Sequence, residues 1–209
     1  GETTNYIYNY ADRRIGKTGA TTLTSIWSGG MITLDITNIS QPSTNRLYIN
    51  GGVNYGMVVN YSYMPRTANA QGDTAFNTTP GNDIVNFDQY GNQNNGQALT
   101  DESNPYGYRG YYGDVESGNY YLSARYYDPE IQRFTQPDTY RGNNPYAYSN
   151  GDPVNRTDPS GHYTVGDKVK AYGYGTADSY GGGAHTKSFN GETLTIAKMV
   201  SGNGRTRIY

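Results

Sequence analysis

The stretch PYGYRGYYGDVESGNYYLSARYYDPEIQRFTQPDTYRGNNPYAYSNGDPVNRTDPSGH, residues 105–162, has the densest pattern of the chain. Two tyrosine-rich segments, Tyr106–Gly113 and Asn119–Asp128, are separated by the short sequence Val115–Gly118. Tyrosine-rich runs around a short glycine-containing connection are typical of a β-hairpin whose tight turn position is glycine. The stretch therefore predicts a hairpin at its start.

The pattern continues as a meander and then changes. If Asn119–Asp128 is one strand, alternation places Tyr120, Leu122, Ala124 and Tyr126 on one face. Asp128-Pro129-Glu130 is a turn sequence, and Ile131–Thr135 is expected to form a third short strand. We therefore predict a three-stranded antiparallel meander over residues 106–135. Beyond Pro137, Asn-Pro, Asp-Pro and Asn-Gly pairs follow too closely for another long strand, which predicts a compact, turn-built plug.

Composition indicates an all-β protein with an unusual core. The 28 glycines and many small polar residues favour turns over long helices. The 24 tyrosines supply most of the large apolar area, and each brings a hydroxyl that needs a partner. The net charge of -2 and the lack of a basic run predict no nucleic-acid partner. No apolar run has membrane-spanning length, so no membrane span is expected.

Metal and cofactor sites are not expected. The chain has no cysteine, which excludes disulfides and thiolate metal sites. His162 and His185 are the two histidines and cannot form a metal site unaided, and no carboxylate lies at ligand spacing beside His185. We interpret both as solvated loop residues.

Residues 105–162 resemble the core domain that ends the shell of Rhs and tyrosine/aspartate (YD) repeat proteins. The resemblance is carried by GYYGDVESGNYYLSARYYDPEIQRFTQPD and then by NPYAYSNGDPVNRTDPSGH. It implies a β-sheet ribbon wound into a hollow shell, with this core segment closing one end. It also implies a secreted or surface-displayed protein, often with a variable C-terminal segment that can be a toxin.

The first 104 residues extend the resemblance. Tyr6–Arg14 resembles the end of a YD repeat, with Asn9 and Asp12 in place of the usual Asp and Gly, and Asp83–Asn92 resembles another, with Asp88 and Gly91 as its turn residues. We expect residues 1–104 to form a ribbon of hairpins, with a polar, loop-rich part near 64–100.

Individual strands of this ribbon are visible as β-branched or aromatic runs. Thr21–Trp27, Met31–Ile39 and Asn45–Asn50 are separated by glycine pairs or by Pro-Ser. They predict successive hairpins. Val53–Tyr63 reads as one further strand buried on both faces, which Pro65 ends.

Residues 163–209 predict a small β domain. Val165–Lys170 opens a strand, Thr176–Lys187 is a glycine-rich connection, and Glu192–Val200 alternates as a half-buried strand does. The segment resembles the first part of a bacterial Src-homology-like barrel of the type that binds cell-wall peptidoglycan. The sequence stops where the last strands of such a barrel would be needed, so the domain is expected to be incomplete.

The resemblance to the Rhs core also implies chemistry. Such cores resemble intramolecular aspartyl proteases, and on matching positions Asp138 and Asp158 are the candidate catalytic pair, with the cut falling after His162. That reaction needs two neighbouring carboxyl groups, one acid and one base. The alternative is that both aspartates accept hydrogen bonds in turns. The sequence favours this alternative and a chain that stays mostly uncleaved.

Three functions stay open. The first is structural: the C-terminal part of a large secreted or surface-displayed Rhs/YD-repeat shell or wall fibre, with a wall-binding tail. The second is a polymorphic toxin whose core cuts after His162 and releases a C-terminal effector. The third is a carbohydrate-binding adhesin. The tail is short for an enzyme, which favours the first.

The expected partners and location follow from the resemblance. Partners would be the rest of a longer chain, peptidoglycan or another glycan, and further copies pairing through β-edges. A start at Gly1 rather than methionine suggests a piece of a longer exported protein, which we expect at the surface of a Gram-positive bacterium.

Overall fold

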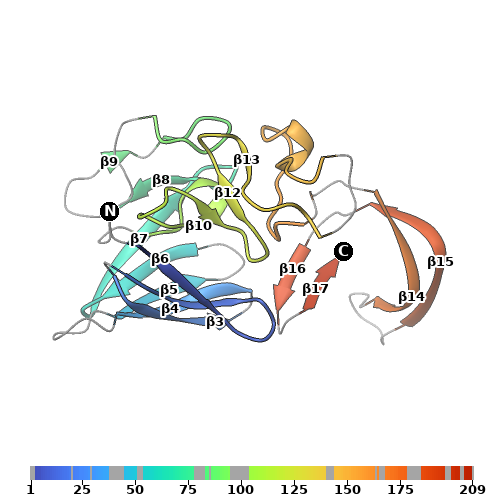
Figure 1. Cartoon of the computed structure of the whole chain (residues 1–209), viewed down its shortest axis with the longest axis horizontal. Helices are drawn as coiled ribbons and strands as arrows, with labels where there is room; N and C mark the ends of the chain where they lie inside the picture. The colour runs from blue at the N-terminus through green and yellow to red at the C-terminus, as the bar shows by residue number, and fades with distance from the viewer. Residues whose placement is uncertain are drawn as a thin grey trace.

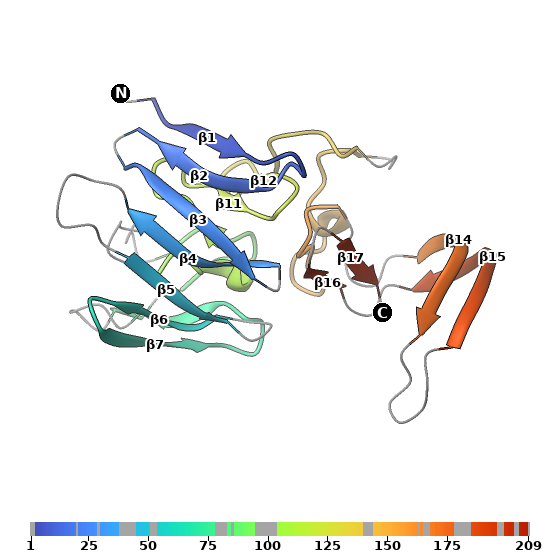
Figure 2. The ribbon, with the colours of Figure 1, turned by 90° about the horizontal axis from the view of Figure 1, so that it is seen from below.

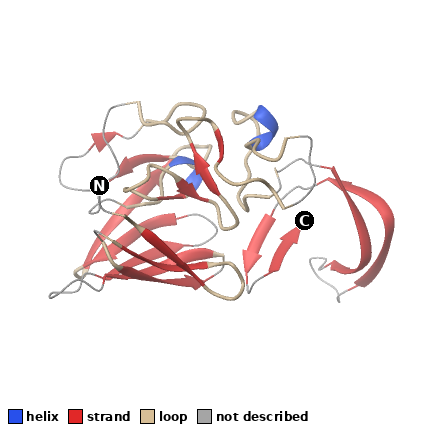
Figure 3. Ribbon diagram, in the orientation of Figure 1, coloured by secondary structure: helices blue, strands red, loops and turns tan. Residues whose placement is uncertain are grey.

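The computed structural model describes residues 3–19, 21–28, 30–37, 45–50, 54–77, 83–84, 86–94, 104–139, 144–162, 164, 168–177, 185–195, 199–202 and 205–208. Within them the protein is almost entirely β-structure, as the composition predicts, and every strand pairing is antiparallel (Figure 1). The only helical segments described are two short 3₁₀ turns (Figure 3). No helix in these ranges is long and apolar enough to cross a membrane.

Most of the N-terminal half is a nine-stranded sheet in which each strand pairs with the next along the chain (Figure 2). Its strands are β1 (Asn5–Tyr8), β2 (Arg14–Thr18), β3 (Leu23–Ser28), β4 (Met31–Thr37), β5 (Asn45–Asn50), β6 (Asn54–Val59), β7 (Ser62–Ala68), β8 (Thr74–Asn77) and β9 (Asp83–Ile84). The predicted ribbon of hairpins is therefore present. Its expected boundary at residue 104 stays a prediction.

One strand prediction in the ribbon is wrong. Residues 53–63 are not one strand that Pro65 ends, because the chain reverses at Asn60 and Tyr61, which both have positive φ values (49° and 64°). Two consecutive left-handed residues form the tight hairpin turn that matches strand twist. Pro65 lies inside β7, opposite Gly56.

The ribbon turns repeat one local design. Asn9 Oδ1 accepts hydrogen bonds from the backbone N–H groups of residues 11 and 13, at 2.9 and 3.1 Å. Asp88 Oδ1 does the same for residues 90 and 92, at 2.8 and 3.0 Å. The residue three positions on has positive φ in both turns: Asp12 (55°) and Gly91 (95°). Both predicted YD-type turns are thus observed, and Asn69 forms a third that the sequence pattern did not single out.

Residues 105–135 form a four-stranded meander rather than the predicted three-stranded one. Its strands are β10 (Tyr112–Gly113), β11 (Tyr120–Tyr121), β12 (Tyr126–Asp128) and β13 (Arg133–Phe134), preceded by the 3₁₀ turn η1 (Tyr108–Gly110). The turn between β10 and β11 is where the sequence placed it, with Gly118 at a φ of 71°. The difference arises at Ser123, where a φ of 67° lets the chain fold back.

The fold-back changes which tyrosines share a face. Tyr120 is the cross-strand partner of Tyr127, and Tyr121 is that of Tyr126. Directly paired residues share a face of the sheet, and successive residues alternate between faces. Tyr120 and Tyr126 therefore lie on opposite faces, and the prediction that they share one is wrong. Directly opposed rings across strands stabilise a sheet.

The described residues between Pro137 and His162 have the predicted plug character. They consist of turns, the 3₁₀ turn η2 (Ser149–Gly151) and one isolated bridge, Arg133 to Ala147. Tyr148 from this plug is buried and packs in one cluster with Tyr108, Tyr127 and Phe134 of the meander.

A second cluster joins the meander to the ribbon. Tyr106 and Tyr112 pack with Ile32, Tyr48 and Met57 of β4, β5 and β6. The hydroxyls of Tyr48 and Tyr112 both donate to the buried carboxylate of Asp35, at 2.8 and 2.7 Å. In this cluster the tyrosine rings are buried and their hydroxyls have hydrogen-bond partners, as the composition predicts.

Two separate hairpins make up the described tail: β14 (Lys168–Ala177) with β15 (His185–Thr195), and β16 (Met199–Gly202) with β17 (Arg205–Ile208). The strands run further into the expected glycine-rich connection than predicted, and His185 lies in β15 rather than in a loop. The described strands of the tail do not close into a barrel.

Candidate active site

The structure brings Asp138 and Asp158 together around one cation, Arg125. Its Nη2 atom lies 2.9 Å from Asp138 Oδ2 and 3.6 Å from Asp158 Oδ2. The three side chains are 4%, 12% and 3% exposed for Arg125, Asp138 and Asp158 respectively. Two carboxylates separated by 20 positions in the sequence are therefore neighbours in a largely buried site.

Arg125 reaches this position because of the fold-back at Ser123. The turn places Arg125 just before β12, where its backbone carbonyl accepts the Leu122 N–H at 3.0 Å. Its guanidinium carbon lies 3.6 Å from the centre of the Phe134 ring. A guanidinium stacks well on an aromatic face, which accounts for a cation in an otherwise apolar cluster.

Asp158 is also a turn residue. Its Oδ1 accepts the backbone N–H groups of Gly161 and His162, at 2.9 and 3.1 Å. Gly161 has a φ of 75°, and a Cβ there would lie 2.9 Å from the carbonyl oxygen of Leu122, so glycine is required at this close approach. The turn hydrogen bonds that the sequence suggested for Asp158 are present, and they fix residues 161 and 162 against it.

His162 contacts the other aspartate. Its Nδ1 lies 2.9 Å from Asp138 Oδ1, with the histidine side chain 25% exposed. The prediction of a solvated loop residue is therefore wrong for His162, because the loop that follows Asp158 turns it back toward Asp138. The backbone of Asp138 is held separately, since its N–H donates to the Pro145 carbonyl at 2.9 Å.

Burial governs the electrostatics of the pair. It raises the pKa of Asp158 to about 6, although the Arg125 charge and the Gly161 and His162 N–H groups act in the opposite direction. Burial also lowers the pKa of Arg125, against the attraction of both carboxylates. A carboxyl group with a pKa near 6 can hold a proton close to neutrality.

The arrangement can supply an acid and a base next to one peptide bond. The carbonyl of His162 belongs to the bond that the sequence resemblance marks for cleavage, and Tyr163, on its other side, lies outside the described residues. The sequence resemblance points to both aspartates but not to Arg125. Arg125 could have been identified from the sequence as a single arginine within a tyrosine-rich strand, because a cation on a buried face needs an anionic partner.

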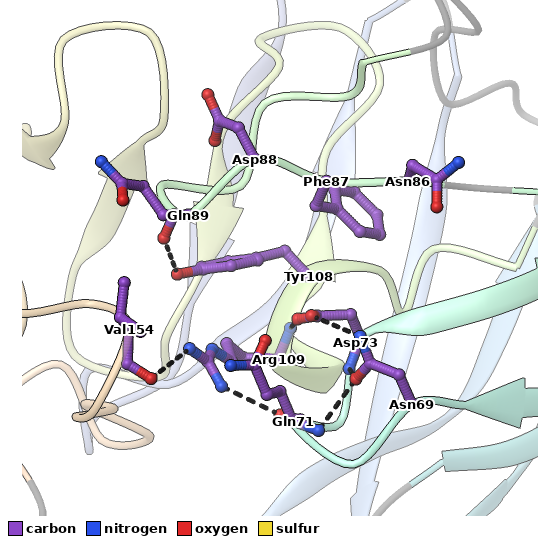
Figure 4. Close-up of a pocket in the computed structure, with 10 residues that line it drawn as sticks. All are labelled: Asn69, Gln71, Asp73, Asn86, Phe87, Asp88, Gln89, Tyr108, Arg109 and Val154. Atoms are coloured by element: carbon purple, nitrogen blue, oxygen red, sulfur yellow. Dashed lines mark hydrogen bonds between the residues drawn. The ribbon is translucent and has the colours of Figure 1, made fainter.

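A separate cavity of about 360 Å³ lies between the ribbon turns, η1 and the plug (Figure 4). The carboxylates that line it accept hydrogen bonds from backbone N–H groups. Asp73 accepts the Arg109 N–H at 2.8 Å, and Asp88 closes its own turn. No cluster of three or more metal-ligating side chains is present among the described residues.

Comparison with known proteins gives sequence relatives that are much longer than this chain. It is 33% identical over 151 residues to the tRNA(Glu)-specific nuclease WapA of Bacillus subtilis subsp. natto, covering 67% of this chain and 6% of the relative. It is 38% identical over 106 residues to the tRNA nuclease WapA of Bacillus subtilis strain 168, covering 46% of this chain and 4% of the relative. No family model matches the chain.

Solved structures share the fold at lower identity. The TcdB2-TccC3-Cdc42 crystal structure aligns with a TM-score of 0.56 and 20% identity over 76% of this chain and 9% of that one. The TcdB2-TccC3 structure without its hypervariable C-terminal region aligns with a TM-score of 0.56 and 18% identity, over the same shares. Together, the sequence relatives and the shared fold support placing this chain in the Rhs/YD-repeat family.

Proposed function

We propose that the chain is the closing part of an exported Rhs/YD-repeat shell of the polymorphic-toxin type, and that its core cuts the chain after His162. The segment from Tyr163 onward would then be released from the core. The similarity to nucleases named WapA favours this function over the purely structural one that the sequence alone favoured. Because the chain spans about 6% of the first of these relatives, the proposal concerns the cut and not the activity of any released part.

One observation carries the proposal: Arg125 Nη2 contacts both aspartates, and Asp158 binds the N–H of His162. An aspartate that only forms a turn needs the hydrogen bond to the backbone N–H, but it does not need to share an arginine with a second aspartate. The carboxylates thus share one cation, and Asp158 also bonds the residue before the proposed cut, which supports their assignment as a general acid and base.

The two carboxyl groups have different parts in the proposed reaction. Asp138, beside the guanidinium, takes a proton from water, and the resulting hydroxide attacks the carbonyl carbon of His162. Asp158, whose pKa is raised to about 6, donates its proton to the nitrogen of Tyr163 as the C–N bond breaks. The products are a carboxyl group on His162 and an amine on Tyr163.

Intact-mass measurement of freshly synthesised chain tests this function. We expect a fragment that begins at Tyr163 to accumulate, and to disappear in Asp138→Asn and Asp158→Asn. Asp152→Asn is the matched control, because Asp152 also precedes a proline and its Oδ1 also accepts turn hydrogen bonds, from Asn155. A chain that keeps its full mass would refute the proposal and support the turn-residue interpretation.

The structural function remains the second candidate, and the edge of the sheet favours it. Among the described strands, β1 is at the end of the sheet order and pairs with β2 only. Open edges recruit further strands, so the proposed partner is a preceding part of a longer chain or another copy. Wall binding by residues 163–209 and glycan binding by the whole chain stay proposals, which peptidoglycan sedimentation and a glycan array would test.

A further inference from the structure

We infer that Arg125 is a positioning residue for the cleavage proposed above, fixing the two aspartates and the backbone before His162 in one arrangement. This inference rests on the proposed function. Each guanidinium nitrogen has its own task. Nη2 contacts both carboxylates, Nη1 donates to the Pro145 carbonyl at 2.8 Å, and Nε donates to the carbonyl of Gly161.

The geometry of these contacts depends on the shape of the guanidinium. Its five N–H groups point in fixed directions within one plane, so a single group sets the relative positions of everything it binds. Phe134 covers one face of that plane, and the side chain is almost fully buried. A lysine ammonium would keep the charge but could not hold the Gly161 carbonyl, the Pro145 carbonyl and both carboxylates at once.

The contact with Gly161 connects Arg125 to the proposed cut. The Gly161 carbonyl lies one peptide unit before the His162 carbonyl, and Asp158 holds the N–H groups of the same two residues. Arg125 thus binds a carbonyl group of this short segment, and Asp158 binds its N–H groups. A misplacement of about 1 Å at a reacting centre can cost about 100-fold in rate.

A buried ion pair can also have a purely structural role, and this chain contains one that can be compared with Arg125. Arg14 is 1% exposed, pairs with the buried Asp114, and has its guanidinium over the rings of Tyr112 and Tyr121. Arg14 and Arg125 therefore share burial, an acidic partner and aromatic cover, but Arg14 bonds neither aspartate of the site. Arg14→Lys is the control for loss of a buried guanidinium.

The experiment follows cleavage of the full chain by intact mass after cell-free synthesis, from about pH 4.5 to 8, together with thermal unfolding. We expect Arg125→Lys to fold and to cleave about 100-fold more slowly, while folded Arg14→Lys cleaves as the parent does. Added methylguanidinium, but not methylammonium, should restore cleavage in Arg125→Ala. The alkaline limb of the Arg125→Ala profile should also move upward, because Arg125 lowers the pKa of Asp158.

The outcomes separate the two proposals. Cleavage of folded Arg125→Lys at the parent rate with an unchanged pH profile would overturn the positioning role and leave the proposed function standing. A parent chain that stays whole at every pH would overturn both. If Arg125→Ala does not fold, Arg125→Lys alone decides.

Discussion

His162 Nδ1 lies 2.9 Å from one oxygen of the Asp138 carboxylate, and Arg125 Nη2 lies 2.9 Å from the other. Both oxygens of the proposed base are therefore in contact with a side chain, one with His162 and the other with Arg125. Since an oxygen that already has a hydrogen-bond partner is less available to water, His162 should slow the proposed cleavage.

The first prediction concerns this restraint. His162→Leu should cleave faster than the parent chain, because it removes the side chain that contacts Asp138 Oδ1 at 2.9 Å. A hydrogen bond to a charged group is worth about 1.5 kcal/mol or more, which corresponds to about tenfold in rate. His162→Gln is the control, because it keeps a polar side chain that can still bond to Asp138. Equal rates for the parent and His162→Leu would contradict the restraint.

The second prediction is a pH dependence of stability from Asp158. Its folded pKa, about 6, is above the ordinary 3.8, so the folded state binds this proton more tightly than the unfolded state does. The stabilisation is complete below the ordinary pKa and is lost as the pH rises through about 6. Such a shift corresponds to roughly 2–3 kcal/mol.

Denaturant unfolding against pH measures this effect. The chain with Asp158 should lose that stability between about pH 4 and pH 7 relative to Asp158→Asn, with Asp138→Asn in both chains so that the peptide bond stays whole. Parallel curves for the two chains would show that Asp158 titrates as an exposed carboxyl group.

The third prediction concerns the tyrosine core. Tyr127 is fully buried, and its ring centre lies 4.2 Å from that of Tyr148. Tyr127→Ala should therefore lower the free energy of unfolding by about 3–5 kcal/mol, and Tyr126→Ala, also buried, by a similar amount. Tyr61→Ala, at a fully exposed position, should change it by less than about 0.5 kcal/mol. Chemical denaturation of the three variants checks the ranking.

The fourth prediction compares two equivalent turn positions. Asp12 has a φ of 55° where the other YD-type turn has Gly91. Asp12→Gly should stabilise the chain by about 1 kcal/mol, because glycine adopts this conformation without strain. Gly91→Ala should destabilise it, since a Cβ there would lie 2.7 Å from the Tyr108 ring. Opposite signs in thermal unfolding are expected, and a destabilising Asp12→Gly would contradict the turn argument.

The local sequence predicted much of the fold correctly. The β3, β4 and β5 strands were visible as β-branched runs, and the turns at Asn9 and Asp88 as Asx residues followed by a left-handed position. These features depend on neighbours within a few residues. Short-range hydrogen bonding and backbone preference are enough to specify them.

Strand continuity was less predictable. Asn60, Tyr61 and Ser123 all have positive φ without being glycine, and each reverses the chain where the sequence predicted one strand. A non-glycine residue in that conformation is unfavourable by itself and persists where the strands on either side of the turn pair with each other. Strand pairing, rather than the preference of the single residue, therefore decides these turns.

The sequence by itself determined the all-β class, the turn-built plug and, through resemblance to a family, the two aspartates as candidates. Tertiary structure alone decided that Asp138 and Asp158 share Arg125, and that His162 turns back onto Asp138. The number of residues between two turns does not determine how far apart the turns lie in the folded protein. The fold-back at Ser123 and the aromatic cover from Phe134 bring these charges together, because a buried cation is stable only where anions and a ring face surround it.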